Sequence, residues 1–470
     1  MKHHKLTATQ VLRKFRDRSL KVTDYVESLL ESCVINEHLN AFIYQDREAI
    51  LTKAVEADKS YDDGNQTGIL CGLPIVLKDN INTADLPTTG GTEALANHRP
   101  KKDAPVAHQL WEAGAALFGK TGMHELAFGI TSNNACFGAV RNPYDPDKIA
   151  GGSSGGSAVA VAKGMAPFGL GTDTGGSCRI PAALCGVVGF RPTIGRYSQE
   201  GLIPISHTRD TIGHLACTVE DVLLLHSVIS GDSVKPDLVS LKGLKLGLPK
   251  SYFRENLDSQ LEAVINQIVN HLSSEGVEWI EVDVPNVEEL NAGCSFPVAL
   301  YEVVRDLRDY LMKYETGLSL EELIDQVRSP DVKGVLSSQM NGDEVMPEAA
   351  YLAAIQTHRP SLQSTLSDYF SQQGVDAIVY PTTPLPARPI GGDETVALNG
   401  IEEPTFPTYI RNCDPGSNAG IPCLSIPVGM TSDGLPVGME LAAPMNQDHR
   451  LLSIGMTLES VIEPIPSPIG

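Results

Sequence analysis

The sequence predicts an α/β fold: a single large domain with a mixed central β-sheet covered by helices on both faces. Short apolar runs such as 74–77 and 115–118 have the length of buried strands, and helical patterns such as 106–113 separate them along the chain. Hydrophobic residues make up 42% of the 470 residues and are spread over the whole length, which is enough for an extended core. Strands without polar alternation are typical of sheets enclosed by helices.

The N-terminal region predicts helices. Thr7 and Gln10 form a capping box ahead of an apolar helical pattern. Thr23 is placed to cap a second helix and Asp46 a third, over 47–57. We therefore expect a helical region at 1–65 that packs on one compact catalytic unit at 66–470.

The rest of the chain alternates between strand and helix patterns. Predicted strands are 74–78, 115–118, 245–248, 280–282, 377–380, 424–428 and 437–441, and predicted helices are 106–113, 157–163, 219–228, 261–272, 298–311 and 348–370. The 43 glycines and 31 prolines crowd into 141–205 and 380–435, which predicts long ordered loops there. The linker candidate is 231–241, a polar stretch between two such patterns.

Charge and composition narrow the class of protein. Lys and Arg total 36 against 58 Asp and Glu, a formal charge of −22, and no basic cluster occurs, which argues against nucleic acid or an anionic membrane as partner. No stretch approaches the roughly 18 apolar residues of a membrane span, and no secretory signal is visible. Nine cysteines without CxxC spacing suit reduced thiols. We expect a cytoplasmic enzyme.

Three motif matches lack the context that their chemistry needs. Residues 114–121 fit the phosphate-loop pattern, but the four intervening residues read as a strand rather than a loop. His124 begins an HExxH match whose second ligand position is Phe128, and the other histidines show no metal spacing, so we expect no metal. Residues 151–155 fit GxSxG, but a polar, turn-rich segment precedes them instead of the strand of a nucleophile elbow.

With these three matches set aside, two glycine-rich turns hold the candidate catalytic residues. The segments 151–157 and 171–177 each end in serine, and a helical pattern follows each, so backbone N–H groups and hydroxyls should lie together. Lys78 ends an apolar strand, where loss of solvation lowers the pKa of an ammonium group. A neutral lysine can act as base for a serine. The alternative is that Lys78 only forms an ion pair with Asp79.

The segments 72–79, 151–157 and 171–179 resemble the amidase signature family, and the similarity runs from about residue 5 to 460. The resemblance implies amide hydrolysis by a Ser–cis-Ser–Lys triad without metal or cofactor. It implies Ser177 as nucleophile, Ser153 as the bridging serine reached through a cis peptide, and Lys78 as base. The oxyanion hole would be the N–H groups of Thr174, Gly175, Gly176 and Ser177, and hydrogen bonds of Ser154, Asp173 and Arg179 would hold the site together.

Finer features at 123–132, 189–193, 205–210 and 411–422 resemble the branch that hydrolyses indoleacetamide and mandelamide. This resemblance implies a substrate pocket at Phe128, Gly129, Ile130, Thr131 and His207. His207 has an alternative role in fixing a loop, and Phe128 and Ile130 have one as ordinary core.

The chain departs from the family pattern at three places. Gly122 stands where Asn is frequent, Cys178 follows the nucleophile where Ile or Val is usual, and 441–444 lacks an acidic residue. Cys178 is either a rival nucleophile or a small packed side chain.

We expect an amidase that converts small aryl-alkyl primary amides to acid and ammonia. Its partners would be the amide and water, with a homodimer as an option. Alternatives are cleavage of anilides or carbamates, and the amidase subunit of a tRNA-linked glutamine amidotransferase. Ile180 and 208–211 disfavour the latter, because that subunit generally carries Gln and a Ser-Leu-Asp-Gln stretch there. A catalytically dead scaffold is a third class, which the intact triad disfavours.

Overall fold

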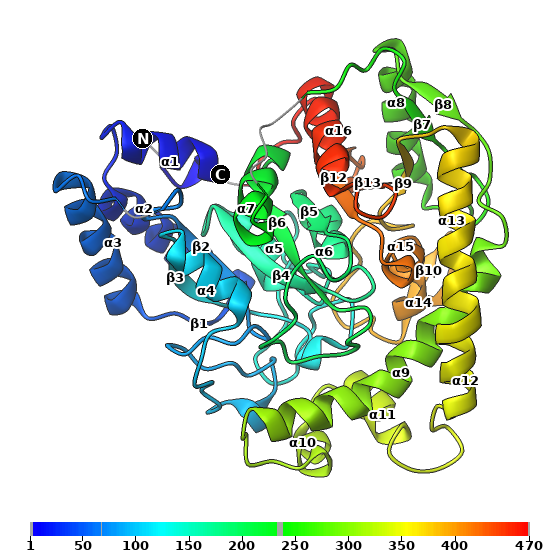
Figure 1. The fold of residues 1–470 in the computed structure, drawn as a ribbon, viewed down its shortest axis with the longest axis horizontal. Helices are drawn as coiled ribbons and strands as arrows, with labels where there is room; N and C mark the ends of the chain where they lie inside the picture. The colour runs from blue at the N-terminus through cyan, green and yellow to red at the C-terminus, as the bar shows by residue number, and fades with distance from the viewer. Residues whose placement is uncertain (1–2, 67, 233–237, 469–470) are drawn as a thin grey trace.

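The structure is a computed structural model that describes residues 3–66, 68–232 and 238–468. Within these ranges a mixed sheet of eleven strands crosses the molecule, flanked by helices (Figure 1). Its strands lie in the order β1 (Phe42–Tyr44), β3 (Ala116–Thr121), β2 (Pro74–Lys78), β4 (Phe168–Asp173), β6 (Thr211–Ala216), β5 (Val188–Arg191), β12 (Cys423–Met430), β13 (Pro436–Ala442), β9 (Ala377–Pro381), β7 (Lys245–Gly247) and β8 (Glu278–Ile280). The predicted α/β class with a mixed sheet is confirmed.

The strand directions explain why the sheet is mixed. β2 runs parallel to β3 and β4, and β7 runs parallel to β8 and β9. The strands between these two parallel groups pair antiparallel from β4 to β9. The central strands β2, β4, β5, β6 and β9 are buried along their whole length, as expected for a sheet enclosed by other layers.

Two of the predicted N-terminal caps are confirmed. The Thr7 hydroxyl accepts the N–H of Gln10 at the start of α1 (Ala8–Arg16), and the side-chain oxygen of Gln10 accepts the N–H of Thr7. Asp46 accepts the N–H of Ala49 at the start of α3 (Arg47–Asp62), which runs five residues beyond its predicted end. Both caps satisfy N–H groups that a helix leaves free at its first turn.

The predicted cap at Thr23 is wrong. Helix α2 (Val22–Ile35) begins one residue before it. The Asp58 carboxylate, on α3, accepts the N–H groups of Val22 and Thr23 at 2.7 and 3.1 Å and the Thr23 hydroxyl at 2.7 Å. A cap supplied by another helix leaves no local signal in the sequence.

The remaining helices are α4 (Pro105–Glu112), α5 (Gly155–Ala162), α6 (Arg179–Cys185), α7 (Val219–Ser230), α8 (Ser259–Ser274), α9 (Val287–Lys313), α10 (Leu320–Gln326), α11 (Pro330–Ser338), α12 (Glu348–Ala353), α13 (Arg359–Gln373), α14 (Thr405–Ile410), α15 (Asp414–Ala419) and α16 (Asp448–Val461). The other predicted helices form with altered bounds, and five further helices, α10, α11, α14, α15 and α16, were not predicted. The helix predicted at 348–370 contains a π-helical turn at Ala354–His358, and the strand predicted at 280–282 lies two residues earlier.

The prediction of long loops at 141–205 and 380–435 is wrong in large part. The first stretch holds α5, β4, α6 and β5, and the second holds α14, α15, β12 and the hairpin of β10 (Thr395–Leu398) with β11 (Ile401–Pro404). Glycine serves close packing here: a Cβ on Gly171 would lie 2.6 Å from the Ser154 Oγ. Five residues of the linker candidate, 233–237, lie outside the described residues.

The phosphate-loop match is confirmed as a false one. Residues 116–121 form β3, and the buried Lys120 Nζ donates to the Ile81 carbonyl and the Thr88 hydroxyl, each at 2.8 Å.

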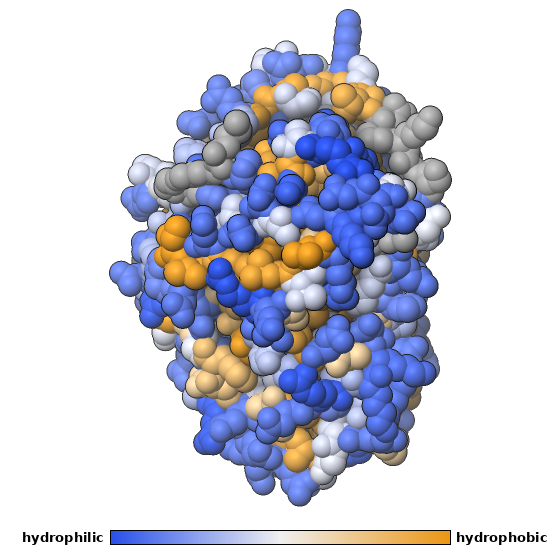
Figure 2. Space-filling view, turned by 90° about the vertical axis from the view of Figure 1, so that its left-hand side faces the viewer, coloured by the Kyte–Doolittle hydropathy of each residue, from blue (hydrophilic) through white to orange (hydrophobic). Residues whose placement is uncertain are grey.

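The N-terminal region joins the main sheet at its edge. β1 pairs antiparallel with β3, and the Asp221 carboxylate on α7 accepts the N–H groups of Ala8 and Thr9 on α1. The side of the molecule shown in Figure 2 is largely hydrophilic, with narrow apolar bands between polar side chains. Among the described helices, none is both long and apolar enough to cross a membrane.

Candidate active site

Lys78 lies at the end of β2 and is fully buried. Its Nζ is 2.7 Å from the Ser153 Oγ, 2.8 Å from the Thr172 Oγ1 and 3.4 Å from the Thr172 carbonyl oxygen. A neutral amine matches these three partners, because it can donate to both Thr172 oxygens and accept the Ser153 hydroxyl proton. The sequence-predicted base and bridging serine are therefore in direct contact.

Burial lowers the pKa of Lys78 to about 8. The alternative ion pair with Asp79 does not form. The Asp79 carboxylate turns the other way, accepts the Thr89 N–H at 3.0 Å and lies 3.5 Å from the Lys120 Nζ. Since all three hydrogen-bond partners of Lys78 are uncharged, nothing in direct contact offsets its loss of solvation.

The two glycine-rich turns lie side by side. The Ser154 N–H donates to the Ser177 carbonyl oxygen at 3.1 Å, and the Ser154 hydroxyl donates to the Thr172 carbonyl at 3.2 Å. The peptide bond between Gly152 and Ser153 is cis. Ser154 thus joins the turn that carries Ser153 to the strand and loop that carry Ser177.

Ser177 lies in the turn between β4 and α6 and lines a cavity. Among the described residues, the Ser177 hydroxyl has no hydrogen-bond partner. The hydrogen bond between Ser153 and Ser177 that is expected of a triad is therefore not formed in this structure. Hydrogen bonds of a catalytic group often close only when substrate is bound.

One sequence-predicted oxyanion donor is already engaged. The N–H of Gly176 donates to the Asp173 carboxylate at 2.9 Å, and Gly176 does not line the cavity. Thr174, Gly175 and Ser177 do line it, and their N–H groups have no hydrogen-bond partner among the described residues. In this conformation the Gly176 N–H is therefore not free to bind an oxyanion, and the N–H groups of Thr174, Gly175 and Ser177 are the free members of the predicted set.

Asp173 holds this loop in shape. Its carboxylate accepts the N–H groups of Gly176 and Cys178 and contacts the buried guanidinium groups of Arg179 and Arg191 at 2.9 and 3.0 Å. Burial alone would raise the pKa of Asp173, but the two guanidinium groups hold it below its usual value.

Arg179 uses all five of its N–H donors. Two go to Asp173, and the others go to Glu440 at 2.5 Å, the Ser417 hydroxyl at 2.6 Å and the Cys413 carbonyl at 3.1 Å. Because every donor of its guanidinium is used, Arg179 connects the loop that carries Ser177 to β13 and α15.

Sequence reasoning missed several residues of this network. Glu440, on β13, is a second buried acidic partner of Arg179 beside Asp173, and it immediately precedes 441–444, the segment without an acidic residue. Asp210 accepts the Thr174 hydroxyl at 2.6 Å, and Thr172 contacts Lys78. An acidic residue inside an otherwise apolar strand was the available signal for Glu440.

The cavity at Ser177 encloses about 40 Å³. Phe128, Gly129 and Ile130, predicted for the substrate pocket, line it. Sequence reasoning did not name its other lining residues, which are Ala127, Ile205, Arg209, Ser295, Phe296, Ala299, Phe406 and Ile410. Apart from Arg209, which is paired with Asp414, the wall is mostly apolar, and it carries no histidine, cysteine or carboxylate among the described residues.

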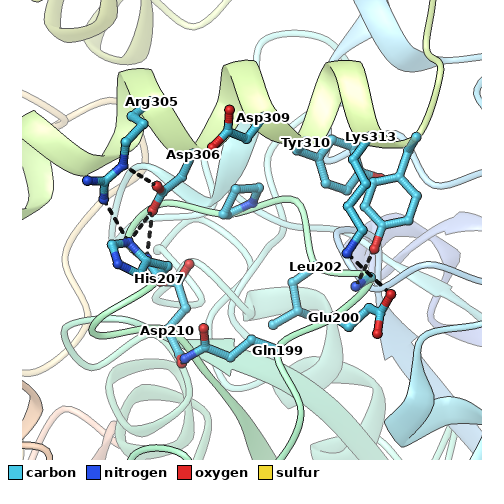
Figure 3. Close-up of a pocket in the computed structure, with 13 residues that line it drawn as sticks. Gln199, Glu200, Leu202, His207, Asp210, Arg305, Asp306, Asp309, Tyr310 and Lys313 are labelled. Atoms are coloured by element: carbon cyan, nitrogen blue, oxygen red, sulfur yellow. Dashed lines mark hydrogen bonds and ion pairs between the residues drawn. The ribbon is translucent and has the colours of Figure 1, made fainter.

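Thr131 and His207 lie outside this cavity. The Thr131 hydroxyl donates to Asp393 at 2.7 Å. His207 lines a different pocket and bonds to Asp306 at 3.0 Å (Figure 3). Asp306 also accepts the backbone N–H of His207, which favours the loop-fixing role that was its alternative.

Cys178 is fully buried beside Ser154. Burial raises the pKa of its thiol to about 12, so the reactive thiolate is scarce near neutral pH. This environment suits a packed side chain rather than a rival nucleophile.

A large mixed sheet that brings a buried lysine in contact with one serine close to a second serine and free N–H groups at a cavity is typical of hydrolases that attack a carbonyl carbon. That is the class of protein which fold and site define together.

Comparisons with known proteins place the chain within this class. It matches the family model named Amidase over residues 24–452. An indoleacetamide hydrolase of Rhizobium radiobacter is 46% identical over 453 residues, 96% of each chain. A mandelamide hydrolase of Pseudomonas putida is 38% identical, covering 98% of this chain and 92% of that protein. A crystal structure of an amidase is similar with a TM-score of 0.88 at 32% identity, over 97% of this chain and 100% of the other.

The chain belongs to the amidase family and is a hydrolase that acts on amide C–N bonds. The resemblance inferred from the sequence motifs is confirmed.

Proposed function

We propose that the protein hydrolyses small aryl-alkyl primary amides to a carboxylic acid and ammonia, with Ser177 as nucleophile. The observation that carries this proposal is the 2.7 Å contact between the Lys78 Nζ and the Ser153 Oγ, next to Ser177 and its free N–H groups. The two named relatives, which act on indoleacetamide and mandelamide, support the choice of substrate class.

In the first half-reaction the Ser177 oxygen bonds to the amide carbon. Its proton passes to Ser153 while the Ser153 proton passes to Lys78, so the base gains one proton and no free alkoxide forms. The carbonyl oxygen becomes an oxyanion that accepts the N–H groups of the loop. When the C–N bond breaks, the proton returns through Ser153 to the leaving nitrogen and ammonia departs.

In the second half-reaction water attacks the acyl-enzyme. Lys78, again through Ser153, takes the water proton, and the Ser177 oxygen leaves with a proton. The atoms balance to one acid and one ammonia per amide and water, and no group outside the chain is needed.

The acyl group of the substrate would occupy the apolar part of the cavity. Phe296 and Phe406 lie beside each other there, with ring centroids 6.1 Å apart and ring planes at 45°. Phe296 is 45% exposed, so its ring borders both the cavity and solvent.

We expect Phe296→Ala to raise KM for phenylacetamide about 3- to 10-fold with a smaller change in kcat, because it removes an aromatic contact to the ring and no reacting group. Acetamide, which has no ring, should show little change. Steady-state kinetics on both amides makes the comparison. An equal rise in KM for acetamide would mean that Phe296 does not contact the aryl group.

The pH dependence should follow Lys78. Since burial lowers its pKa to about 8, kcat/KM on an uncharged amide should rise with pH along a limb with a midpoint near 8, belonging to the coupled Lys–Ser–Ser system. Between pH 8 and the ordinary value of 10.5 the unfolded chain holds a proton that the folded protein has released, so this group makes the free energy of unfolding rise with pH. A pH–rate profile that is flat between pH 6 and about 9 would contradict this role.

A panel of amides tests the proposed substrate class. The purified chain should hydrolyse indoleacetamide, mandelamide and phenylacetamide faster than glutamine, anilides or carbamates, with ammonia released in equal amount to acid. Faster turnover of anilides or carbamates would favour the alternative with larger leaving groups. Preference for glutamine would favour the amidotransferase subunit, which Ile180 and 208–211 disfavour.

We also propose that 1–65 forms a layer on the catalytic unit 66–470 rather than a separate domain. Its support is the pairing of β1 with β3 and the bonds from α1 to Asp221 on α7.

A further inference from the structure

The segment 124–131 begins with the histidine of the incomplete HExxH match and forms one side of the cavity at Ser177. Four of its residues line that cavity: Ala127, Phe128, Gly129 and Ile130. Leu126 and Ala127 adopt left-handed backbone conformations, with φ of 50° and 59°. Such conformations cost free energy in residues other than glycine, so contacts with the rest of the molecule must hold the segment in this shape.

The His124 ring packs directly against this segment. It is buried, at 1% exposure, and a Cβ on Gly129 would lie only 2.2 Å from its Nε2. The ring can approach the backbone this closely because residue 129 is a glycine. The backbone N–H of His124 donates to the Ser153 carbonyl oxygen at 3.2 Å. His124 therefore contacts both the cavity lining and the turn that carries the bridging serine.

Contacts at both ring nitrogens fix the orientation of the His124 ring. Its Nε2 donates to the Asp331 carboxylate at 2.9 Å, since an ionised carboxylate can only accept. Its Nδ1 lies 3.3 Å from the Thr131 hydroxyl oxygen, which donates its proton to Asp393 at 2.7 Å. Burial raises the pKa of Asp331, but hydrogen bonds from His124 and the backbone hold it below its usual value.

The start of α11 is the anchor for these contacts. Asp331 lies in the first turn of this helix. Just before the helix, the N–H groups of Arg328 and Ser329 donate to the buried Glu125 carboxylate at 3.2 and 2.7 Å. Two consecutive side chains, His124 and Glu125, therefore attach the segment to the same point of the fold.

We propose that His124 is a positioning residue for substrate binding. Through its hydrogen bond to Asp331, the ring holds 127–130 in the shape that receives the acyl side chain of the amide. Neither His124 nor Asp331 is among the described residues that line the cavity, so both act through Gly129 and its neighbours. The inference rests on the proposed function, because it takes the acyl side chain to bind in this cavity.

Binding of phenylacetamide to the full chain in a Ser177→Ala background measures affinity without turnover. We expect Asp331→Ala to raise Kd about 5-fold or more, because it removes the charge-assisted hydrogen bond that orients the ring. Asp331→Asn keeps an oxygen that can accept from Nε2 and should recover part of the affinity. His124→Gln, whose amide N–H extends toward the position of Nε2, should bind better than His124→Asn, whose shorter side chain does not reach Asp331.

Asp232→Ala is the matched control. The Asp232 carboxylate lies 3.1 Å from the His449 Nε2 and is 37% exposed, against 33% for Asp331, and neither Asp232 nor His449 is among the described residues of the cavity lining. Asp232→Ala should lower the melting temperature and leave Kd unchanged. A role of Asp331 in stability alone would give the same result for Asp331→Ala.

Steady-state kinetics on proteins that keep Ser177 separates binding from chemistry. Asp331→Ala should raise KM for phenylacetamide while kcat changes less than about 3-fold, because no reacting group is removed. The KM for acetamide, which has no aryl group, should stay the same.

Unchanged Kd in either Asp331→Ala or His124→Asn would overturn the inference, as would an equal rise in Asp232→Ala or in the KM for acetamide. The proposed function can fail separately. A chain that binds phenylacetamide in the Ser177→Ala background, but does not hydrolyse it when Ser177 is present, would contradict the proposed function alone. Absence of phenylacetamide binding in that background would contradict both.

Discussion

Ser177→Ala is expected to lower kcat for amide hydrolysis by about 10⁴-fold or more, because loss of the nucleophile in a serine hydrolase leaves only the contribution of substrate binding and the oxyanion hole. Stability should change by less than about 1 kcal/mol, since the Ser177 hydroxyl makes no hydrogen bond to described residues. Single-turnover assays with phenylacetamide, beside thermal melts of both proteins, measure the two effects.

The neighbouring cysteine provides the matched control. Cys178→Ala changes a buried side chain one position away and should keep kcat within a few-fold of the parent. If Cys178→Ala lost activity while Ser177→Ala kept it, the thiol would be the nucleophile and the serine-based account would fail.

Lys78→Met is expected to lose roughly 10³-fold or more in kcat, because it removes the group that takes the proton from Ser153 while keeping the length of the side chain. The fold should hold, since the three hydrogen-bond partners of Lys78 are uncharged and no buried carboxylate in contact with it is left unpaired. Lys78→Arg should be equally inactive, because arginine does not release its proton near neutral pH.

Lys120→Met should show the opposite pattern. Burial lowers the pKa of Lys120 to about 8 as well, but its Nζ pairs with the buried Asp79. Removing it leaves that carboxylate without its cation and should lower the free energy of unfolding by about 3–5 kcal/mol. Activity per folded molecule should persist. An active Lys78→Arg, or equal losses of activity in both methionine variants, would contradict the assignment of Lys78 as base.

Local signals in the sequence predicted much of the fold. The capping box at Thr7, the cap at Asp46 and the buried strand that ends at Lys78 all depend on residues close in the chain. Strands β1, β4, β5, β6, β10 and β11 were not predicted. Of these, β4, β5 and β6 are short buried strands that contain glycine, and such strands have neither polar alternation nor helical period. The sheet stabilises them through neighbours that are distant in sequence.

The candidate site also has contacts that the sequence predicted and contacts that it did not. The motifs predicted that Lys78 and Ser153 belong to one site, because the strand that ends at Lys78 and the glycine-rich turn that contains Ser153 can both be recognised in the sequence. The engagement of the Gly176 N–H by Asp173 did not, because a motif identifies a donor without showing what it already donates to. Glu440 lies in a segment with no catalytic pattern, and Asp210 lies in a segment whose motif assigned it no role. Only the tertiary structure brings them to Arg179 and Thr174.

Covalent labelling tests the central claim most directly. A serine-directed fluorophosphonate, incubated with the intact protein and mapped by peptide mass spectrometry, should modify Ser177 alone, because this hydroxyl lines the cavity and the N–H groups of Thr174 and Gly175 lie beside it. Lys78→Arg should slow the labelling strongly at neutral pH. An adduct on Ser153 or Cys178, with Ser177 unmodified, would contradict the account.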